Sequence, residues 1–523
     1  MKSSHQIGNA APPVAVIDIG STFIRLTIAE KRGVRGVRVL ERAVQSVAIG
    51  RDVVKERRIS NTTIEQCVSI LQSFAVLLKE YGIQPEAVQA VTNAAVRQAD
   101  NRDAFIDRLS IASRIPFRMI DPGQIGYYYH LALRVIRSKQ SGWEKGNVAV
   151  TEIGGLTCSL LFRKEGEIRF AQTYGIGSLR LLQQMEKAGL GPSQLEELAQ
   201  GRTREMAIHL RQNIGADEPL RLLFMGREMR YAAARLHAKE KASSTAAIVT
   251  RLSVSALERL VGQVVRESVE EEVRLWQISY PDAELLAPSL CMAISIARAL
   301  QLKHVYVSNL SFSDGLLVEA VDGLVWTTTM KRHVLRIAKE TGAKYRYDAR
   351  HAEKVSEAAL SLFDLLQSEH GCTDRHRLLL EIACLLHDIG VFVNARGHHK
   401  HALYLIRNTE FTGLSLSEIN LIALIARYHR KATPQMNHPD YAALTHDDRL
   451  VVCKLAALLR VADALDRVHD QSLGKLRFEL APEAVLCIPE RRVETSAEQV
   501  ALVEKGDLFE QIFGRRCLVR TPH

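Results

Sequence analysis

VAVIDIGSTFIRLTIAE (residues 14–30) and VAVTEIGGLTCSLLF (residues 148–162) are the two stretches that decide the expected fold. Each begins with an apolar strand that reaches an acidic residue, Asp18 or Glu152, turns at a glycine and returns as a second strand. Backbone N–H groups and hydroxyls at such a turn can bind a phosphate. Because the same design occurs twice, the sequence predicts a duplicated α/β architecture with a cleft between its halves.

The length and composition are those of a globular protein with more than one domain. A chain of 523 residues is too long for one hydrophobic core, and 47% apolar residues with 24% charged residues is ordinary for a globular protein. No apolar run approaches the roughly 20 residues that span a bilayer. Residues 1–13 lack the apolar core of a signal peptide, so we interpret them as a disordered leader. Eight scattered cysteines without a CxxC pair indicate reduced thiols in a cytoplasmic protein.

The net charge of +10 favours an anionic partner, such as phosphates, nucleotides, nucleic acid or a membrane surface. A basic soluble protein without such a partner is the alternative, and the charge alone does not decide between them.

Further segments carry a family resemblance: VTNAAVRQADN (91–101), IGSLRL (176–181), DGLL (314–317), HHKHALYLIRN (398–408) and ALIARYHRK (423–431). Together with the two hairpins, they make the chain similar to the Ppx/GppA family of exopolyphosphatases and guanosine pentaphosphate phosphohydrolases. The resemblance implies an actin/Hsp70-like (ribonuclease H-like) duplicated α/β fold, a divalent metal such as Mg²⁺ or Mn²⁺, and a homodimer. It implies polyphosphate or a guanosine nucleotide as the partner, and neither a membrane nor nucleic acid. The phosphate-binding residues that it implies are Asp18, Gly20, Ser21, Thr22, Arg25, Arg97, Gly154, Gly155, Thr157 and Arg180.

The chain also departs from the family pattern at its catalytic carboxylates. Ser159 stands where the family has the glutamate that positions the attacking water, and Leu156 replaces a glycine. The stretch IDPGQIG (120–126) matches the segment of a second family glutamate but contains none. Further departures are Thr22 and Phe23 in the first turn, Arg227-Glu228 in a later glycine turn, and Ser313 in place of an arginine. Since attack by water on a phosphoanhydride needs a base, the N-terminal site is expected to be degenerate, with Asp121 and Glu152 as the candidate catalytic substitutes.

The last third of the sequence changes to amphipathic helices, expected at 350–363, 377–388, 421–429 and 451–466. CLLHDIG (384–390) ends one of them in an adjacent His387-Asp388 pair, and a divalent metal accepts both donor types. Asp463 lies among apolar neighbours, where a carboxylate is costly unless paired or metal-bound. His351, His387, Asp388 and Asp463 follow the order of the HD metal-dependent phosphohydrolase superfamily, which they resemble. His398 and His429 fall where some HD proteins bind a second metal ion, and Asp466 is interpreted as a solvated or capping acid.

We therefore expect a leader (1–13), two actin-like domains (14–132 and 133–325), an all-α HD domain (326–470) and an α/β tail (471–523). The expected activity is release of phosphate from inorganic polyphosphate or guanosine pentaphosphate. Two alternatives stay open. In the first, the HD site hydrolyses a nucleotide and the N-terminal cleft only binds. In the second, the chain binds polyphosphate or an alarmone without turnover.

Overall fold

The computed structural model describes residues 12–32, 36–215, 218–240, 248–323 and 327–520. The chain divides into two compact units, Met1–Met330 and Lys331–His523. Most of the expected leader lies outside the described residues. No helix in the described ranges combines the length and the apolar character needed to cross a membrane.

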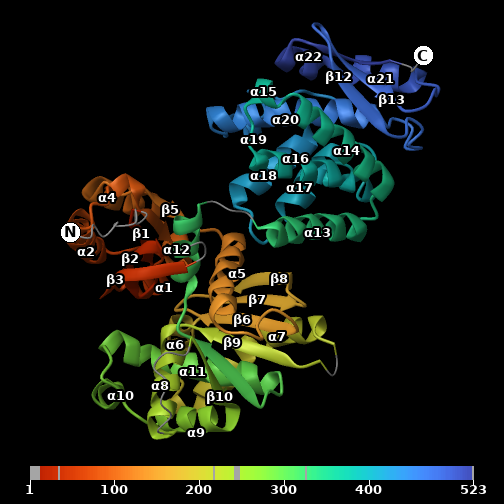
Figure 1. Cartoon of the computed structure of the whole chain (residues 1–523). Coiled ribbons are helices and arrows are strands. Elements are labelled where there is room, and N and C mark those ends of the chain that lie inside the picture. The colour runs from red at the N-terminus through yellow and green to blue at the C-terminus, as the bar shows by residue number, and fades with distance from the viewer. Residues whose placement is uncertain (1–11, 33–35, 216–217, 241–247, 324–326, 521–523) are drawn as a thin grey trace, which may run out of the picture. The chain divides into compact units, whose positions relative to one another are not determined.

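The first unit contains two mixed sheets with the orders β3-β2-β1-β4-β5 and β10-β11-β9-β6-β7-β8 (Figure 1). In both sheets an antiparallel three-stranded meander is followed by strands that pair in parallel, β4 with β1 and β9 with β6. The strands are β1 (Val14–Ile19), β2 (Phe23–Arg32), β3 (Gly36–Ser46), β4 (Gln89–Thr92), β5 (Phe117–Met119), β6 (Asn147–Ile153), β7 (Cys158–Lys164), β8 (Glu167–Tyr174), β9 (Leu220–Met225), β10 (Val249–Ser253) and β11 (His304–Ser308).

The β1–β2 and β6–β7 hairpins have the same turn, closed by an equivalent backbone hydrogen bond. The Gly20 N–H donates to the Phe23 carbonyl at 2.9 Å, and the Gly154 N–H donates to the Thr157 carbonyl at 2.9 Å. Asp18 stands opposite Arg25 across the first hairpin, as Glu152 stands opposite Ser159 across the second. The expected duplicated α/β architecture is therefore confirmed in strand order, in register and in turn geometry.

Helices cover these sheets, and their ends follow local capping rules. Ser60 caps the helix that starts at Asn61, because its hydroxyl accepts from the Thr63 N–H. The predicted domain boundary between residues 132 and 133 lies inside one continuous helix, α5. The helices are α1 (Ile49–Glu56), α2 (Asn61–Glu80), η1 (Pro85–Ala87), α3 (Ala94–Arg97), α4 (Arg102–Ser113), α5 (Pro122–Lys139), α6 (Ser178–Ala188), η2 (Pro192–Gln194), α7 (Leu195–Asn213), α8 (Arg227–Glu240), α9 (Val254–Val264), α10 (Val269–Trp276), α11 (Tyr280–Ala299) and α12 (Phe312–Asp322).

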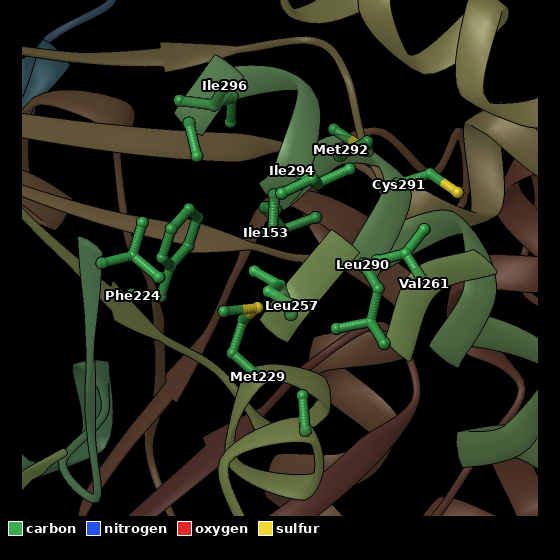
Figure 2. Packing of buried hydrophobic residues seen from close by; sticks show 14 of the residues in the cluster. Ile153, Phe224, Met229, Leu257, Val261, Leu290, Cys291, Met292, Ile294 and Ile296 are labelled. Atoms are coloured by element: carbon green, nitrogen blue, oxygen red, sulfur yellow. The ribbon is translucent and has the colours of Figure 1, made fainter. Parts of the chain in front are cut away.

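Helix α11 is buried around most of its circumference and forms the centre of one core. Figure 2 shows its residues Leu290 and Met292 among side chains from α8, α9, β6 and β9, including Phe224 of β9. A helix that is apolar on every side is stable only inside such a core. A second close contact joins α12 to α5, where a Cβ on Gly315 would lie 2.1 Å from the Tyr128 carbonyl oxygen. The glycine of the DGLL segment is thus required by packing.

The second unit is helical up to residue 464 and ends in a small α/β tail. Strand β13 pairs antiparallel with β12 and in parallel with β14, so the sheet order is β12-β13-β14. Its elements are α13 (Thr328–Lys344), which begins at the end of the first unit, α14 (Ala349–Leu365), α15 (Gln367–His370), α16 (Asp374–Leu386), η3 (Ile389–Phe392), α17 (His398–Arg407), α18 (Leu416–Arg427), α19 (Pro439–Ala442), α20 (His446–Ala464), β12 (Leu476–Leu480), β13 (Ala484–Pro489), α21 (Ser496–Lys505), α22 (Asp507–Phe513) and β14 (Arg516–Val519).

Candidate functional site

The two glycine turns open onto one cleft in the first unit, with a volume of about 870 Å³ when its open mouth is included. Walls also come from the start of α8 and the start of α12. Most of the residues that the sequence singled out for phosphate binding or catalysis line this cleft: Asp18, Gly20, Ser21, Thr22, Arg25, Glu152, Gly154, Gly155 and Thr157.

The turns approach each other closely because both carry small residues. A Cβ on Gly155 would lie 2.7 Å from the Ser21 hydroxyl oxygen of the first turn. A Cβ on Gly177 would lie 2.5 Å from the Gly155 carbonyl oxygen. Since real Cβ atoms do not approach oxygen that closely, Gly155 allows the two turns to meet, and Gly177 allows the start of α6 to pack against the second turn.

A chain of polar contacts runs from Arg25 to Asp18 at the floor of the cleft. Arg25 donates to the hydroxyls of Ser311 and Ser313 at 3.0 and 2.9 Å, and the Ser313 hydroxyl donates to Asp18 Oδ2 at 2.9 Å. Burial raises the pKa of Asp18, against the opposing effect of the Arg25 guanidinium. The other carboxylate oxygen, Asp18 Oδ1, is buried without a hydrogen-bond partner in the described part of the chain. An unpartnered buried carboxylate oxygen is a suitable ligand for a hard divalent cation.

Glu152 is the second acidic residue of the cleft. Its Oε2 accepts a hydrogen bond from the Tyr129 hydroxyl at 3.1 Å. Burial raises the pKa of Glu152, and the guanidinium groups of Arg25 and Arg230 offset this only in part. The cleft therefore combines paired acids with two cations, as a site for a polyanion and a counter-cation requires.

Three of the predicted site residues lie outside the lining of the cleft. Arg97 donates to the Ile120 carbonyl at 2.6 Å, and Arg180 donates to the Leu156 carbonyl at 3.0 Å. Asp121 is the N-cap of α5, with Pro122 at the first helical position. These side chains have structural partners, and their predicted roles in phosphate binding or catalysis stay predictions.

Sequence reasoning missed Glu228 and Arg230, which also line the cleft. Burial raises the pKa of Glu228 to about 7. The neighbouring Arg227 is held by Asp282 at 2.8 and 3.1 Å and lies 4.1 Å from the ring centre of Phe23. The sequence showed Arg227 and Glu228 only as departures in a glycine turn, with no signal for a new carboxylate in the site.

The second unit brings together all six predicted metal ligands. His351 Nε2 lies 3.4 Å from Asp463 Oδ1 and 3.3 Å from His387 Nε2, which forms one triad. A second triad consists of Asp388, His398 and His429, with His398 Nε2 and His429 Nε2 at 3.2 and 3.5 Å from Asp388 Oδ1. His387 Nε2 lies 3.7 Å from Asp388 Oδ2, so Asp388 stands between the two triads.

The orientation of the imidazoles identifies what this cluster can hold. His387, His398 and His429 each direct Nδ1 at a backbone carbonyl three residues earlier, at 2.7, 3.0 and 2.6 Å. Because a carbonyl only accepts, these Nδ1 atoms carry the proton and the Nε2 lone pairs face one another. Nε2 atoms at 3.1 Å in the second triad cannot bond each other in that tautomer. A cation between them satisfies both, so the donor set fits a divalent metal.

Burial and neighbouring charges shift the pKa values of several residues in this cluster. Although burial opposes ionisation, the imidazoles of His387 and His429 hold the pKa of Asp388 below its ordinary value. Burial, together with His387, lowers the pKa of His429 to about 3, so this ring is neutral. Against the effect of burial, Asp463 and Asp466 raise the pKa of His351 to about 9.

Two residues beside the cluster differ from the sequence analysis: Asp466 was wrongly interpreted, and Lys505 was missed. Asp466 is not a solvated acid: it is 3% exposed, and its Oδ2 accepts from His351 Nδ1 at 2.8 Å. The ammonium of Lys505, from the end of α21, forms an ion pair with Asp463 Oδ2. Burial opposes ionisation of Asp463, but the hydrogen bond with His351 and the charge of Lys505 hold its pKa well below the usual range.

The glycine after the His-Asp pair is needed to assemble the second triad. A Cβ on Gly390 would lie 2.0 Å from the His398 carbonyl oxygen and 2.5 Å from the Ala402 nitrogen. The absent side chain lets η3 pack directly against α17, and this contact carries His398 to Asp388. The glycine therefore does more than stop the preceding helix.

Two family models match this sequence, one over most of each unit. The Ppx/GppA phosphatase family model matches residues 27–323, and the model of Ppx/GppA phosphatase domain III matches residues 335–489. An exopolyphosphatase from Cytophaga hutchinsonii is 20% identical with a TM-score of 0.52, over 60% of this chain and 99% of that one. An exopolyphosphatase-like protein is 19% identical with a TM-score of 0.51, over 60% of this chain and all of the other. These structural likenesses show a shared fold. Since the first family match spans more than half of the sequence, the chain belongs to the Ppx/GppA phosphatase family.

Proposed function

We propose that this chain hydrolyses inorganic polyphosphate and releases its terminal phosphate in the cleft of the first unit. The observation that carries the proposal is the pair of glycine turns, which meet at Ser21 and Gly155 and open onto a space lined by Arg25, Arg230 and Glu152. Membership of the Ppx/GppA family and the exopolyphosphatase fold neighbours support the substrate class. Guanosine pentaphosphate is the alternative substrate for the same cleft.

The cationic and the acidic residues of the cleft have different proposed roles. Backbone N–H groups of the two turns and the guanidinium groups of Arg25 and Arg230 bind the phosphoryl oxygens and neutralise the charge that develops on them. Asp18 and Glu152 are the residues that would hold a divalent cation, and Mg²⁺ or Mn²⁺ bound there would polarise the phosphoryl oxygen. The expected loss of the usual carboxylates at Ser159 and at residues 120–126 leaves these binding groups in place.

Phosphate release from long-chain polyphosphate in the presence of Mg²⁺ tests the proposal. Wild-type protein is compared with Glu152→Gln and with Glu205→Gln, an exposed glutamate of α7 that serves as the control. We expect sustained release from wild type and from Glu205→Gln, and a loss of two orders of magnitude or more in Glu152→Gln. A wild-type preparation that binds polyphosphate but releases no phosphate contradicts the proposal.

The metal cluster of the second unit favours a second candidate function, hydrolysis of a phosphorylated nucleotide. In each triad the three side chains offer ligand atoms that lie within 4.8 Å of one another, which fits two divalent metal ions, with Asp388 between them. A positive field surrounds this cluster: burial, followed by the charges of His398, Lys400, Lys431 and Arg427, lowers the pKa of the adjacent His399 to about 4. Such a field attracts phosphate esters.

Substitutions in the cleft and in the cluster can distinguish the two candidate functions. Asp388→Ala removes the carboxylate that stands between the two triads and leaves the cleft intact, whereas Arg25→Ala disrupts the cleft and leaves the cluster intact. If the cluster is catalytic, Asp388→Ala abolishes nucleotide hydrolysis and leaves polyphosphate hydrolysis unchanged. If Asp388→Ala reduces neither activity measured with Mn²⁺, the second candidate is wrong.

A further inference from the structure

Glu228 occupies the first turn of α8, two residues after Gly226, and lines the cleft together with residues of the two hairpins. Gly226 has a φ of +129°, a conformation that favours glycine, and this turn directs the start of α8 at the cleft. An acidic side chain in the first turn of a helix is stabilised by the helix dipole. Glu228 is therefore a carboxylate on the cleft surface that neither the family resemblance nor the proposed function uses.

Glu228 and Glu152 face the same small space. A Cβ on Gly226 would lie 3.9 Å from Glu228 Oε2 and 3.8 Å from Glu152 Cγ. Arg230 interacts electrostatically with both carboxylates. Burial lowers the pKa of Arg230, and the negative charges of Glu152 and Glu228 act in the opposite direction and raise it. One oxygen of Glu152 already accepts from Tyr129, and the charge of Glu152 is attracted by Arg25 and repelled by Asp18. The two glutamates are therefore not equivalent, and Glu228 is the one that has no tyrosine partner among the described contacts.

The surroundings of Glu228 suit proton transfer. The charged groups that act on it are Arg227 and Arg230 of its own helix and Asp282 of α11. Burial, the largest of these influences, raises its pKa to about 7, which is close to the value that an efficient general base needs at neutral pH. Arg227 is fixed by Asp282, which in turn accepts from Tyr231 and Ser279, so the start of α8 is firmly held.

We propose that Glu228 is the general base of the cleft, replacing the carboxylates that this chain lacks at Ser159 and at residues 120–126. The Glu228 carboxylate accepts a proton from water as the water oxygen bonds to the terminal phosphorus. The bond from that phosphorus to the bridging oxygen breaks, and the shortened polyphosphate leaves with the bond's electron pair. The inference rests on the proposed polyphosphate hydrolysis and names the residue that activates its water.

The test compares kcat, KM and pH profiles of wild type, Glu228→Gln, Glu228→Asp and the control Glu205→Gln, with long-chain polyphosphate and Mg²⁺. A general base contributes about 10²–10⁴-fold. We expect kcat of Glu228→Gln to fall about 100-fold or more with KM within about threefold, and Glu228→Asp to recover part of the loss. The wild-type kcat should rise with pH through about 7, and the residual rate of Glu228→Gln should not. Formate should restore turnover to Glu228→Ala.

Three outcomes overturn the inference. The first is a Glu228→Gln variant within threefold of the wild-type kcat, and the second is one with an unchanged pH profile. The third is a loss of cooperative unfolding in both Glu228→Gln and Glu228→Asp, which would assign the residue a structural role. Absence of phosphate release from wild type is a different result: it contradicts the proposed function itself, so the two failures are distinguishable.

Discussion

Lys505 of the tail forms an ion pair with Asp463 of α20, and both side chains are more than nine-tenths buried. The other oxygen of Asp463 faces His351 at 3.4 Å and His387 at 3.8 Å. One carboxylate thus connects the cluster of predicted metal ligands to α21 of the tail, 42 residues further along the chain. The tail is joined to the cluster by charge, in addition to the packing of α20 against α21 and α22.

Replacing Lys505 with methionine should destabilise the metal-free protein. Removing one partner from a buried ion pair costs about 3–5 kcal/mol, because the other charge stays buried. Mn²⁺ at Asp463 replaces the missing positive charge, so the difference in melting temperature from wild type should shrink when Mn²⁺ is added. Mn²⁺ should also bind the variant on the order of tenfold more tightly, since a neighbouring cation has gone.

Calorimetric melting with and without Mn²⁺ measures both effects. Lys475→Met, at an exposed position of the same tail, is the matched control and should change neither quantity. A Lys505→Met variant that is equally destabilised with and without Mn²⁺ would show that Lys505 acts on packing alone.

The number of metal ions bound per chain should distinguish the two triads. We expect two Mn²⁺ ions per chain in wild type, about one in His429→Ala, and weakened binding at both positions in Asp388→Ala, because Asp388 stands between the triads. A chelator should lower the melting temperature of wild type, since binding to the native state alone adds stability by mass action. Metal analysis after gel filtration measures the stoichiometry, with His446→Ala, an exposed histidine of α20, as the control. Equal metal content in wild type and Asp388→Ala would contradict this assignment.

Local sequence patterns were sufficient for much of the fold and for many site residues. The alternation of apolar residues around Gly20 and Gly154 predicts both hairpins, because strand period and turn chemistry are local properties. His351, His387 and Asp463 were singled out because each residue type stands in a suitable helix, in an order that resembles a known superfamily, and the structure brings the three together.

The remaining site residues have no local signal. Ser313 reaches Asp18 across 295 residues, and Lys505 reaches Asp463 across 42, so only the tertiary fold pairs them. Asp466 looks solvated in the sequence because nothing beside it shows that His351 lies within 2.8 Å. Asp121 did carry a signal that was not used: Asp-Pro followed by Gln124 is typical of a helix start, where a cap rather than a base is expected.

Arg25→Ala should reduce kcat/KM for polyphosphate by about 100-fold or more. The guanidinium that holds Ser311 and Ser313 also lines the cleft proposed to bind polyphosphate, and loss of one such charged donor has an effect of that size. Arg38→Ala is the control, because Arg38 lies in β3 of the same sheet with a side chain that is 60% exposed. Steady-state phosphate release measures both variants. Equal losses in the two would indicate a general effect of net charge on the polyanion.

Glu228→Gln should stabilise the protein at pH 8 and leave its stability unchanged at pH 4. The pKa of Glu228 is raised by burial from 4.5 to about 7, so the native state binds this proton more tightly than the unfolded state does. Stability must therefore fall as the pH rises from about 4.5 through 7, and above 7 the full cost of ionising the buried group remains. A shift of this size corresponds to about 3 kcal/mol at most. Glutamine does not ionise, so the variant avoids the cost. Urea unfolding at both pH values measures the difference, with Glu205→Gln expected to match wild type at each. A Glu228→Gln variant that is less stable than wild type at pH 8 would mean that the ionised carboxylate is stabilised in the cleft, and that its pKa lies below 7.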